Sequence, residues 1–146
     1  MAPKFGTSGL RGLVSKLTSA LVSEYVRAFL AACPIGTGLY VARNLRPSSP
    51  DIAAAVIATA CGAGIQVTDC GEALTPTLPA MHAGAAAVMI TGSHIPVDRN
   101  GLKFYLPGGQ ISKADEAAIL AALGSAPAAI GRIKAPCAPA RSACPR

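Results

Sequence analysis

The sequence has no tryptophan, and only 4% of its residues are aromatic. Acidic residues are also scarce, with seven against thirteen lysines and arginines, so the formal net charge is +6. This excess of positive charge favours anionic partners such as phosphorylated metabolites. The basic residues are scattered along the chain, and few aromatic side chains are available to stack on bases. We therefore do not expect a nucleic acid as a partner.

Long apolar runs are missing as well. No run approaches the roughly 20 residues that a membrane-spanning helix needs, and the opening MAPKFGTSGLRG lacks the apolar core of a signal peptide. We therefore expect a cytoplasmic protein that does not bind membranes. The five cysteines form no C-x-x-C pair, and no histidine stands at zinc-finger spacing, which favours thiols over a disulfide framework or a zinc site.

Helix and strand patterns alternate along the 146 residues, a length that fits one domain. Apolar residues three and four apart, preceded by capping hydroxyls, predict helices over 18–33, 49–60, 78–82 and 112–124. Ser49, Pro50 and Asp51 form the strongest of these helix starts, with Ser49 expected as the cap. Short apolar runs predict strands over 39–42, 65–70, 85–90 and 103–106.

This alternation predicts an α/β fold for residues 1–124, with a mixed, largely parallel sheet flanked by helices. Residues 125–146 are rich in alanine and proline, and we interpret them as a linker or a ragged C-terminus. In such sheets ligands bind at the carboxyl ends of the strands. Three polar loops stand at those positions, with the sequences ARNLRPSS, GEALTPT and TGSHIPVDRNG.

The third loop carries Ser93 directly after a glycine and a buried strand. Its hydroxyl could be functional, or it could bond its own backbone as loop serines commonly do. A Ser-His-Asp hydrolase fits poorly, because adjacent residues such as Ser93 and His94 point to different sides and the G-x-S-x-G elbow is absent. His94 could contact a phosphate or be an ordinary surface residue.

Lys103 stands ten residues after Ser93, beyond an Asn100–Gly101 pair that predicts a tight turn. It could supply charge to a phosphate or act as an acid or base, or it could be a solvated lysine at the end of a strand. The N-terminal KFGTSGLRG, which contains Arg11, is a second candidate anion-binding loop because it combines three glycines with two hydroxyls and a guanidinium. It does not match the P-loop pattern.

Taken together, KFGTSGLRG, VARNLRPSS and TGSHIPVDRNGLKFY resemble the first domain of the α-D-phosphohexomutases. That family includes phosphomannomutase, phosphoglucomutase and phosphoglucosamine mutase, and the resemblance covers residues 1–124. It implies a fold of the phosphohexomutase domain I type and an isomerase that moves a phosphoryl group between O6 and O1 of a hexose phosphate. The residues of the first and third segments, KFGTSGLRG and SHIPVDRNGLKFY, favour the phosphomannomutase type. A phosphoglucosamine mutase fragment, or a catalytically silent domain that binds phosphate or a partner, is the alternative.

The resemblance also implies roles for four residues. Ser93 would carry the phosphoryl group as a phosphoserine, and its phosphate would be a ligand of the catalytic Mg²⁺. His94 would contact this phosphate, Lys103 would be an acid/base or charge stabiliser, and Arg11 would reach the reaction centre. Arg11 and Lys103 would thereby also bind the phosphorylated hexose. A hexose 1,6-bisphosphate is the implied activator.

Two residues depart from the family pattern. Ile95 stands where the family usually has asparagine, and Asn44 stands where it usually has aspartate, so a charge that could pair with Arg43 or Arg46 is missing. The family's metal loop, sugar-specificity loop and distal phosphate loop belong to later domains. The resemblance therefore implies that the remaining domains of a full-length enzyme are partners, and that this chain alone is inactive.

Overall fold

The computed structural model describes residues 4–6, 9–33, 35–72, 84–91 and 98–123. Within these residues one sheet has the strand order β1-β2-β6-β5-β3-β4, and β7 pairs with β6. The strands are β1 (Lys4–Gly6), β2 (Gly9–Leu13), β3 (Leu39–Arg43), β4 (Val67–Glu72), β5 (Ala86–Ile90), β6 (Arg99–Leu106) and β7 (Gly109–Gln110). The helices are α1 (Ser19–Ala32), α2 (Ser49–Gly62) and α4 (Lys113–Ala122), with a short 3₁₀ helix at Val14–Lys16.

The sheet is mixed, and the expected α/β fold is confirmed. Strands β4, β3 and β5 run parallel, and α2 provides the crossover that a parallel β3–β4 pair requires. Strands β6, β2 and β1 continue the sheet in antiparallel pairing. Parallel pairing is therefore confined to one half of the sheet, and the other half is built from antiparallel strands.

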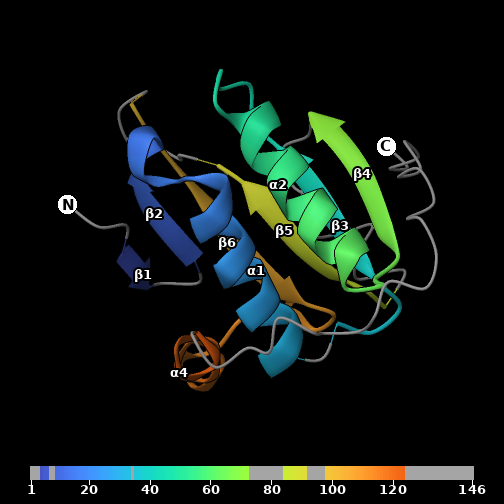
Figure 1. Ribbon diagram of the computed structural model, residues 1–146. Helices are drawn as coiled ribbons and strands as arrows, with labels where there is room; N and C mark the ends of the chain where they lie inside the picture. Colours follow the sequence, from blue (N-terminus) through green and yellow to red (C-terminus); the bar gives the residue numbers. More distant parts are fainter. Residues whose placement is uncertain (1–3, 7–8, 34, 73–83, 92–97, 124–146) are drawn as a thin grey trace.

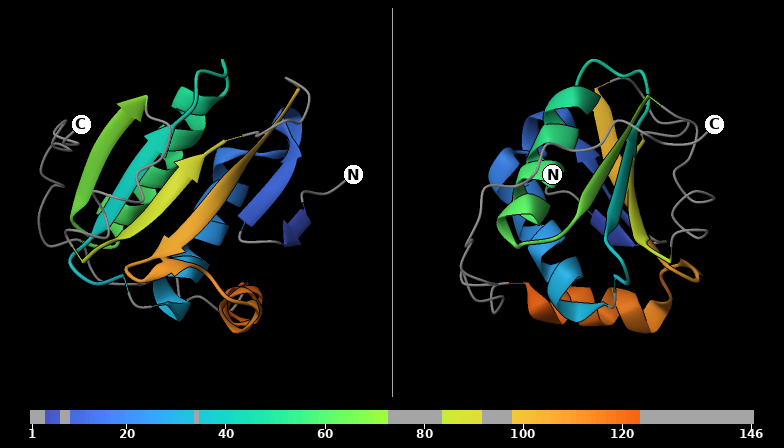
Figure 2. Two further views of the ribbon diagram at one scale, coloured as in Figure 1. Left: turned by 180° about the vertical axis from the view of Figure 1, so that it is seen from behind. Right: turned by 90° about the vertical axis from the view of Figure 1, so that its right-hand side faces the viewer.

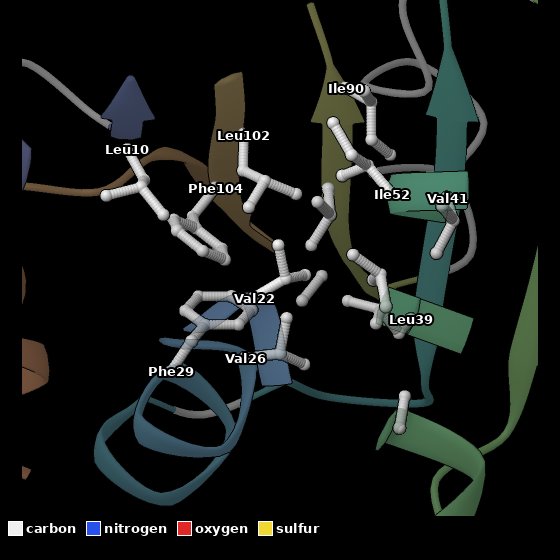
Figure 3. Close-up of a cluster of buried hydrophobic side chains, with 14 of the residues drawn as sticks. Leu10, Val22, Val26, Phe29, Leu39, Val41, Ile52, Ile90, Leu102 and Phe104 are labelled. Atoms are coloured by element: carbon white, nitrogen blue, oxygen red, sulfur yellow. The ribbon is translucent and has the colours of Figure 1, made fainter. Parts of the chain in front are cut away.

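Helices α1 and α2 pack side by side on one face of the sheet (Figures 1 and 2). The main core lies between them and the strands, and Phe29 of α1 meets Phe104 of β6 there with ring centroids 4.7 Å apart (Figure 3). Helix α4 packs against α1 at the end of the sheet away from the arrowheads of β3, β4 and β5. Burial of this apolar face stabilises the sheet and helices as one unit.

Two of the expected helix caps are present. The Thr18 hydroxyl accepts a hydrogen bond from the Leu21 amide at 3.2 Å at the start of α1. Ser112 and Asp115 form a reciprocal capping box at the start of α4. The expectation for α2 was wrong, because Ser49 lies inside the helix and its hydroxyl bonds other side chains rather than capping it.

Two segments expected to be loops are strands. The N-terminal KFGTSGLRG contains β1 and most of β2, and β2 pairs with β6. Asn100 and Gly101 lie within β6 rather than in a turn, because this part of β6 pairs with β2, with Asn100 opposite Gly12 and Gly101 opposite Arg11. The expected helix over 78–82 and the interpreted tail over 125–146 lie outside the described residues.

The described part of the chain contains no helix with the length and apolarity required to cross a membrane. Among its cysteines, Cys33 and Cys70 form no disulfide bond and Cys61 is disulfide-bonded. The expectation of thiols alone was therefore wrong at Cys61.

Candidate functional site

The ends of β3 and β5 and the start of β6 meet at one edge of the sheet, where the arrowheads of β3 and β5 lie in Figure 1. Just beyond β3, the Asn44 amide donates to the Ile90 carbonyl oxygen at 3.0 Å. Just beyond β5, the Thr91 amide donates to the Gly101 carbonyl oxygen at 2.9 Å. These contacts hold the chain in place up to Thr91, two residues before Ser93.

Arg11 and Lys103 lie on the face of the sheet opposite α1 and α2. Their strand neighbours Leu10 and Leu102 are buried in the main core, and successive side chains of a strand point to opposite faces. In the register, Arg11 pairs with Gly101, two residues before Lys103. This diagonal relation on adjacent strands places the two residues roughly 7–8 Å apart.

Gly101 makes room for the Arg11 side chain. A Cβ atom added at Gly101 would lie 2.5 Å from the Leu10 carbonyl oxygen, 3.1 Å from Arg11 Cγ and 3.3 Å from the Thr91 carbonyl oxygen. The stem of Arg11 therefore passes over β6 at a point that also borders the end of β5. Only glycine leaves this space free.

Positive charge dominates this part of the sheet. Arg11 is exposed and Lys103 is half-buried, and neither forms an ion pair with a described residue. Arg46 and Arg99 add two more guanidinium groups at the same edge, where the Arg46 Nη1 group donates to the Arg99 carbonyl oxygen at 2.8 Å. An anion bound above Arg11 and Lys103 would therefore meet positive charge from β2 and β6.

A hydrogen-bond network lies on the other face of the sheet, directly behind these cations. The fully buried Asn100 donates through Nδ2 to Ser48 Oγ at 2.9 Å and to Ser49 Oγ at 3.0 Å. The Ser49 hydroxyl donates in turn to Asn44 Oδ1, which also accepts from the Arg46 amide at 3.2 Å. The loop between β3 and α2 is thereby fastened to the start of β6.

Because Asn44 carries no charge, Arg43 and Arg46 bond other groups. Arg43 forms an ion pair with Asp69 of β4 at 3.9 Å, and Arg46 bonds a backbone carbonyl. Asn44 supplies an acceptor oxygen to the loop, which an aspartate would also supply. The missing charge therefore leaves the hydrogen bonding of this loop intact.

The described residues fit an anion better than a metal. They contain no group of three or more His, Cys, Asp or Glu side chains that could hold a metal ion. The candidate residues Arg11 and Lys103 are cations, which bind phosphate and do not ligate Mg²⁺. The ligands of an implied Mg²⁺ would have to come from a phosphoserine and from residues beyond the described ones.

The structure brings together two of the four expected site residues, Arg11 and Lys103. Ser93 and His94, and the departing residue Ile95, lie outside the described residues. Sequence reasoning missed the contributions of Asn100 and Gly101. The period-two pattern of the apolar residues Leu102 and Phe104, extended two residues back, indicates a core-facing Asn100.

Comparison with known proteins identifies the family. Residues 2–128 match the family model described as phosphoglucomutase/phosphomannomutase, alpha/beta/alpha domain I. The chain belongs to this family. The phosphohexomutase resemblance of its sequence motifs is thereby confirmed, and so is the fold of the domain I type.

Relatives and solved structures agree with this assignment. The chain is 49% identical over 129 residues to phosphomannomutase of Sinorhizobium fredii, covering 83% of the chain and 27% of the relative. It is 37% identical to phosphoglucosamine mutase of Rhodococcus erythropolis, covering 92% of the chain and 34% of the relative. A putative phosphomannomutase structure from Thermus thermophilus aligns with TM-score 0.68 and 30% identity, covering 84% of the chain and 30% of that structure. The chain thus spans about a quarter to a third of the length of these proteins.

Proposed function

We propose that this chain is the phosphoryl-carrying first domain of a phosphomannomutase-type phosphohexomutase, with Ser93 as the carrier. The observation that supports this most strongly is the juxtaposition of Arg11 and Lys103 on one sheet face, beside the end of β5. The chain continues from this end into Ser93, and a phosphoserine there would carry about −1.5 to −2 charges. Two cations on adjacent strands would offset that charge.

In the proposed reaction, the bond between phosphorus and Ser93 Oγ breaks as a bond forms between phosphorus and a hydroxyl oxygen of the hexose phosphate. Lys103 acts as the acid or base for the proton of this exchange or stabilises its charge, and Arg11 holds the transferring group. A hexose bisphosphate forms, reorients, and returns its other phosphoryl group to Ser93. Mg²⁺ would supply charge neutralisation when bound, and His94 would contact the phosphate.

A phosphoglucosamine mutase domain is the second candidate. The Rhodococcus erythropolis protein of that name aligns with more of this chain than the Sinorhizobium fredii phosphomannomutase does, although at lower identity. Both candidates use the same carrier and cations in this proposal. They differ in the sugar, which the family selects through residues in its later domains.

A domain exchange tests the proposal. Residues 1–124 would replace the matching first domain of the Sinorhizobium fredii phosphomannomutase, and mannose 1-phosphate turnover would be measured with Mg²⁺ and a hexose 1,6-bisphosphate. We expect the hybrid enzyme to turn over, and we expect the 146-residue chain alone to be inactive. A folded hybrid without activity, alongside an active unmodified host, would contradict the proposed function. Robust turnover by the chain alone would contradict the need for further domains.

A further inference from the structure

The hydrogen bonds behind the site close into a ring. Asn100 bonds Ser49, Ser49 bonds Asn44, and the Asn44 oxygen accepts from the Arg46 amide. The Arg46 guanidinium then bonds the carbonyl oxygen of Arg99, the residue that precedes Asn100 in the chain. The ring therefore connects the end of β3, the first turn of α2 and the start of β6.

The ring lies next to the backbone that positions the site. The Asn100 Oδ1 atom accepts from the Gly101 amide at 2.9 Å, and the Gly101 carbonyl holds the Thr91 amide. Asn44 holds the other side of the same edge through its amide bond to Ile90. A shift of Asn100 would thus move Gly101, over which the Arg11 stem passes, and loosen the end of β5.

The hydrogen-bond ring uses a helix-capping side chain and two buried polar residues, which costs stability and indicates a specific structural role. Ser48 is the N-cap residue of α2, yet its side chain makes no capping bond and accepts from Asn100 instead. Ser49 and Asn100 are both fully buried polar residues. A buried polar group is tolerated only when its hydrogen bonds are satisfied, and here each polar group of the ring satisfies another.

We propose that Asn100 is a positioning residue of the mutase site, which fastens the loop between β3 and α2 to β6 and thereby fixes Arg11 relative to the end of β5. This inference deepens the proposed function and rests on it for its effect on catalysis. Asn100 acts from the helix-covered face of the sheet and touches neither substrate nor phosphate. Its contribution passes through the backbone of Gly101 and Thr91.

Hydrogen exchange on the 146-residue chain tests the positioning independently of activity. In Asn100→Ala we expect exchange at the Thr91 and Asn44 amides to accelerate by about tenfold or more, because buried partners lose their hydrogen bonds. Ser49→Ala should accelerate the same amides, and Ser48→Ala should do so less because one acceptor of Asn100 remains. Exchange at Val88, in the middle of β5, should change much less.

The matched control is Ile119→Val, which removes one methylene from the fully buried side of α4, at the opposite end of the sheet. This variant should not accelerate hydrogen exchange at Thr91 and Asn44 more than at Val88. Equal acceleration at Thr91, Asn44 and Val88 in Asn100→Ala would show a general loss of stability and overturn the positioning role. Unchanged exchange at Thr91 and Asn44 would overturn it as well.

Kinetics of the hybrid enzyme provide the second readout. Asn100→Ala should lower kcat by about 10- to 100-fold with a smaller change in KM, since misplacement of reacting groups by about 1 Å has effects of this size. Ile119→Val should leave kcat near the unmodified value. Equal kcat for the two variants in an active hybrid would refute the catalytic part of the inference. An inactive unmodified hybrid would count against the proposed function, while hydrogen exchange would still decide the positioning role.

Discussion

Single residues at the sheet edge show how a small side chain can be as important as a charged one. Arg11 and Lys103 bring charge to the face that the proposed site uses, and Gly101 leaves the space that the Arg11 stem occupies. Gly9 is similarly constrained, because a Cβ atom there would lie 2.0 Å from the Leu102 carbonyl oxygen. The close approach of β2 and β6 therefore depends on glycines within the two motifs.

The role of Lys103 can be tested in the hybrid enzyme. Lys103→Ala should lower kcat by roughly 10²–10⁴ and change sugar binding much less, because acid–base groups act on the chemical step. Lys113→Ala is a suitable control, since this lysine is 88% exposed on α4. A kcat equal to that of the control would leave Lys103 as a solvated strand lysine.

The space above Gly101 predicts a specific stability effect. Gly101→Ala should destabilise the chain by about 1–3 kcal/mol, because the new methyl group meets a backbone oxygen that cannot move freely. Gly108→Ala is the matched control, as nothing lies within 4 Å of its added Cβ atom. Urea denaturation would measure both changes. Similar free energies of unfolding for the two variants would show that β2 and β6 adapt easily.

The sequence motifs pointed to the charged residues of the proposed site but not to the residues that support them. Arg11 and Lys103 were singled out from motifs, and the structure places them on adjacent strands, while their roles stay predictions. Asn100 and Gly101 were misinterpreted as a turn, because the Asn-Gly pair is a strong turn signal in isolation. Pairing with β2, a long-range interaction, decided their conformation instead.

Among the elements, α1 and α4 contact each other around Cys33, the residue that ends α1. Burial of the thiol, and to a smaller extent the negative charge of Asp115 near the start of α4, raises the pKa of Cys33 from 9.0 to about 11. The protonated thiol is thus the form that this helix junction accommodates.

This shift predicts a pH dependence of stability. The folded pKa lies above the unfolded value, so the contribution of Cys33 is fully present below about pH 9 and is lost as the pH rises toward 11. The difference in unfolding free energy between the native chain and Cys33→Ala should therefore shrink by about 1–2 kcal/mol between pH 8 and pH 10.5. Thermal or urea denaturation at both pH values would measure it. A difference that stays constant or widens would contradict the assigned burial of the thiol.

Local signals predicted most elements within the described residues. Helices α1 and α4 begin at the expected caps, and β3, β4 and β5 fall within about two residues of the expected strands. The β1–β2 hairpin was missed because its glycines and hydroxyls are typical of loops. The start of α2 was placed one residue too late, with Ser49 expected as the cap, and the buried partners of Ser49 come from residues 5 and 51 positions away.

In the molecule as a whole, the proposed site lies at one edge of a domain. The matched part of this chain corresponds to about a quarter of the length of its phosphomannomutase relatives. Cations on one face and a buried hydrogen-bond ring on the other converge on the strand end that precedes Ser93. This division suits the proposed role of the domain as the carrier of a phosphoryl group. The central claim is therefore about the carrier residue.

Peptide mass spectrometry of the hybrid enzyme, after incubation with a hexose 1,6-bisphosphate and Mg²⁺, tests that claim most directly. The account predicts a single phosphorylated residue, Ser93, which follows the end of β5 in the sequence and whose added charge Arg11 and Lys103 are proposed to offset. It also predicts that Ser93→Ala carries no phosphate and has no mutase activity. A phosphate mapped to Ser8 in the glycine-rich N-terminal motif, or a Ser93→Ala hybrid with normal turnover, would contradict the phosphoserine mechanism for this protein.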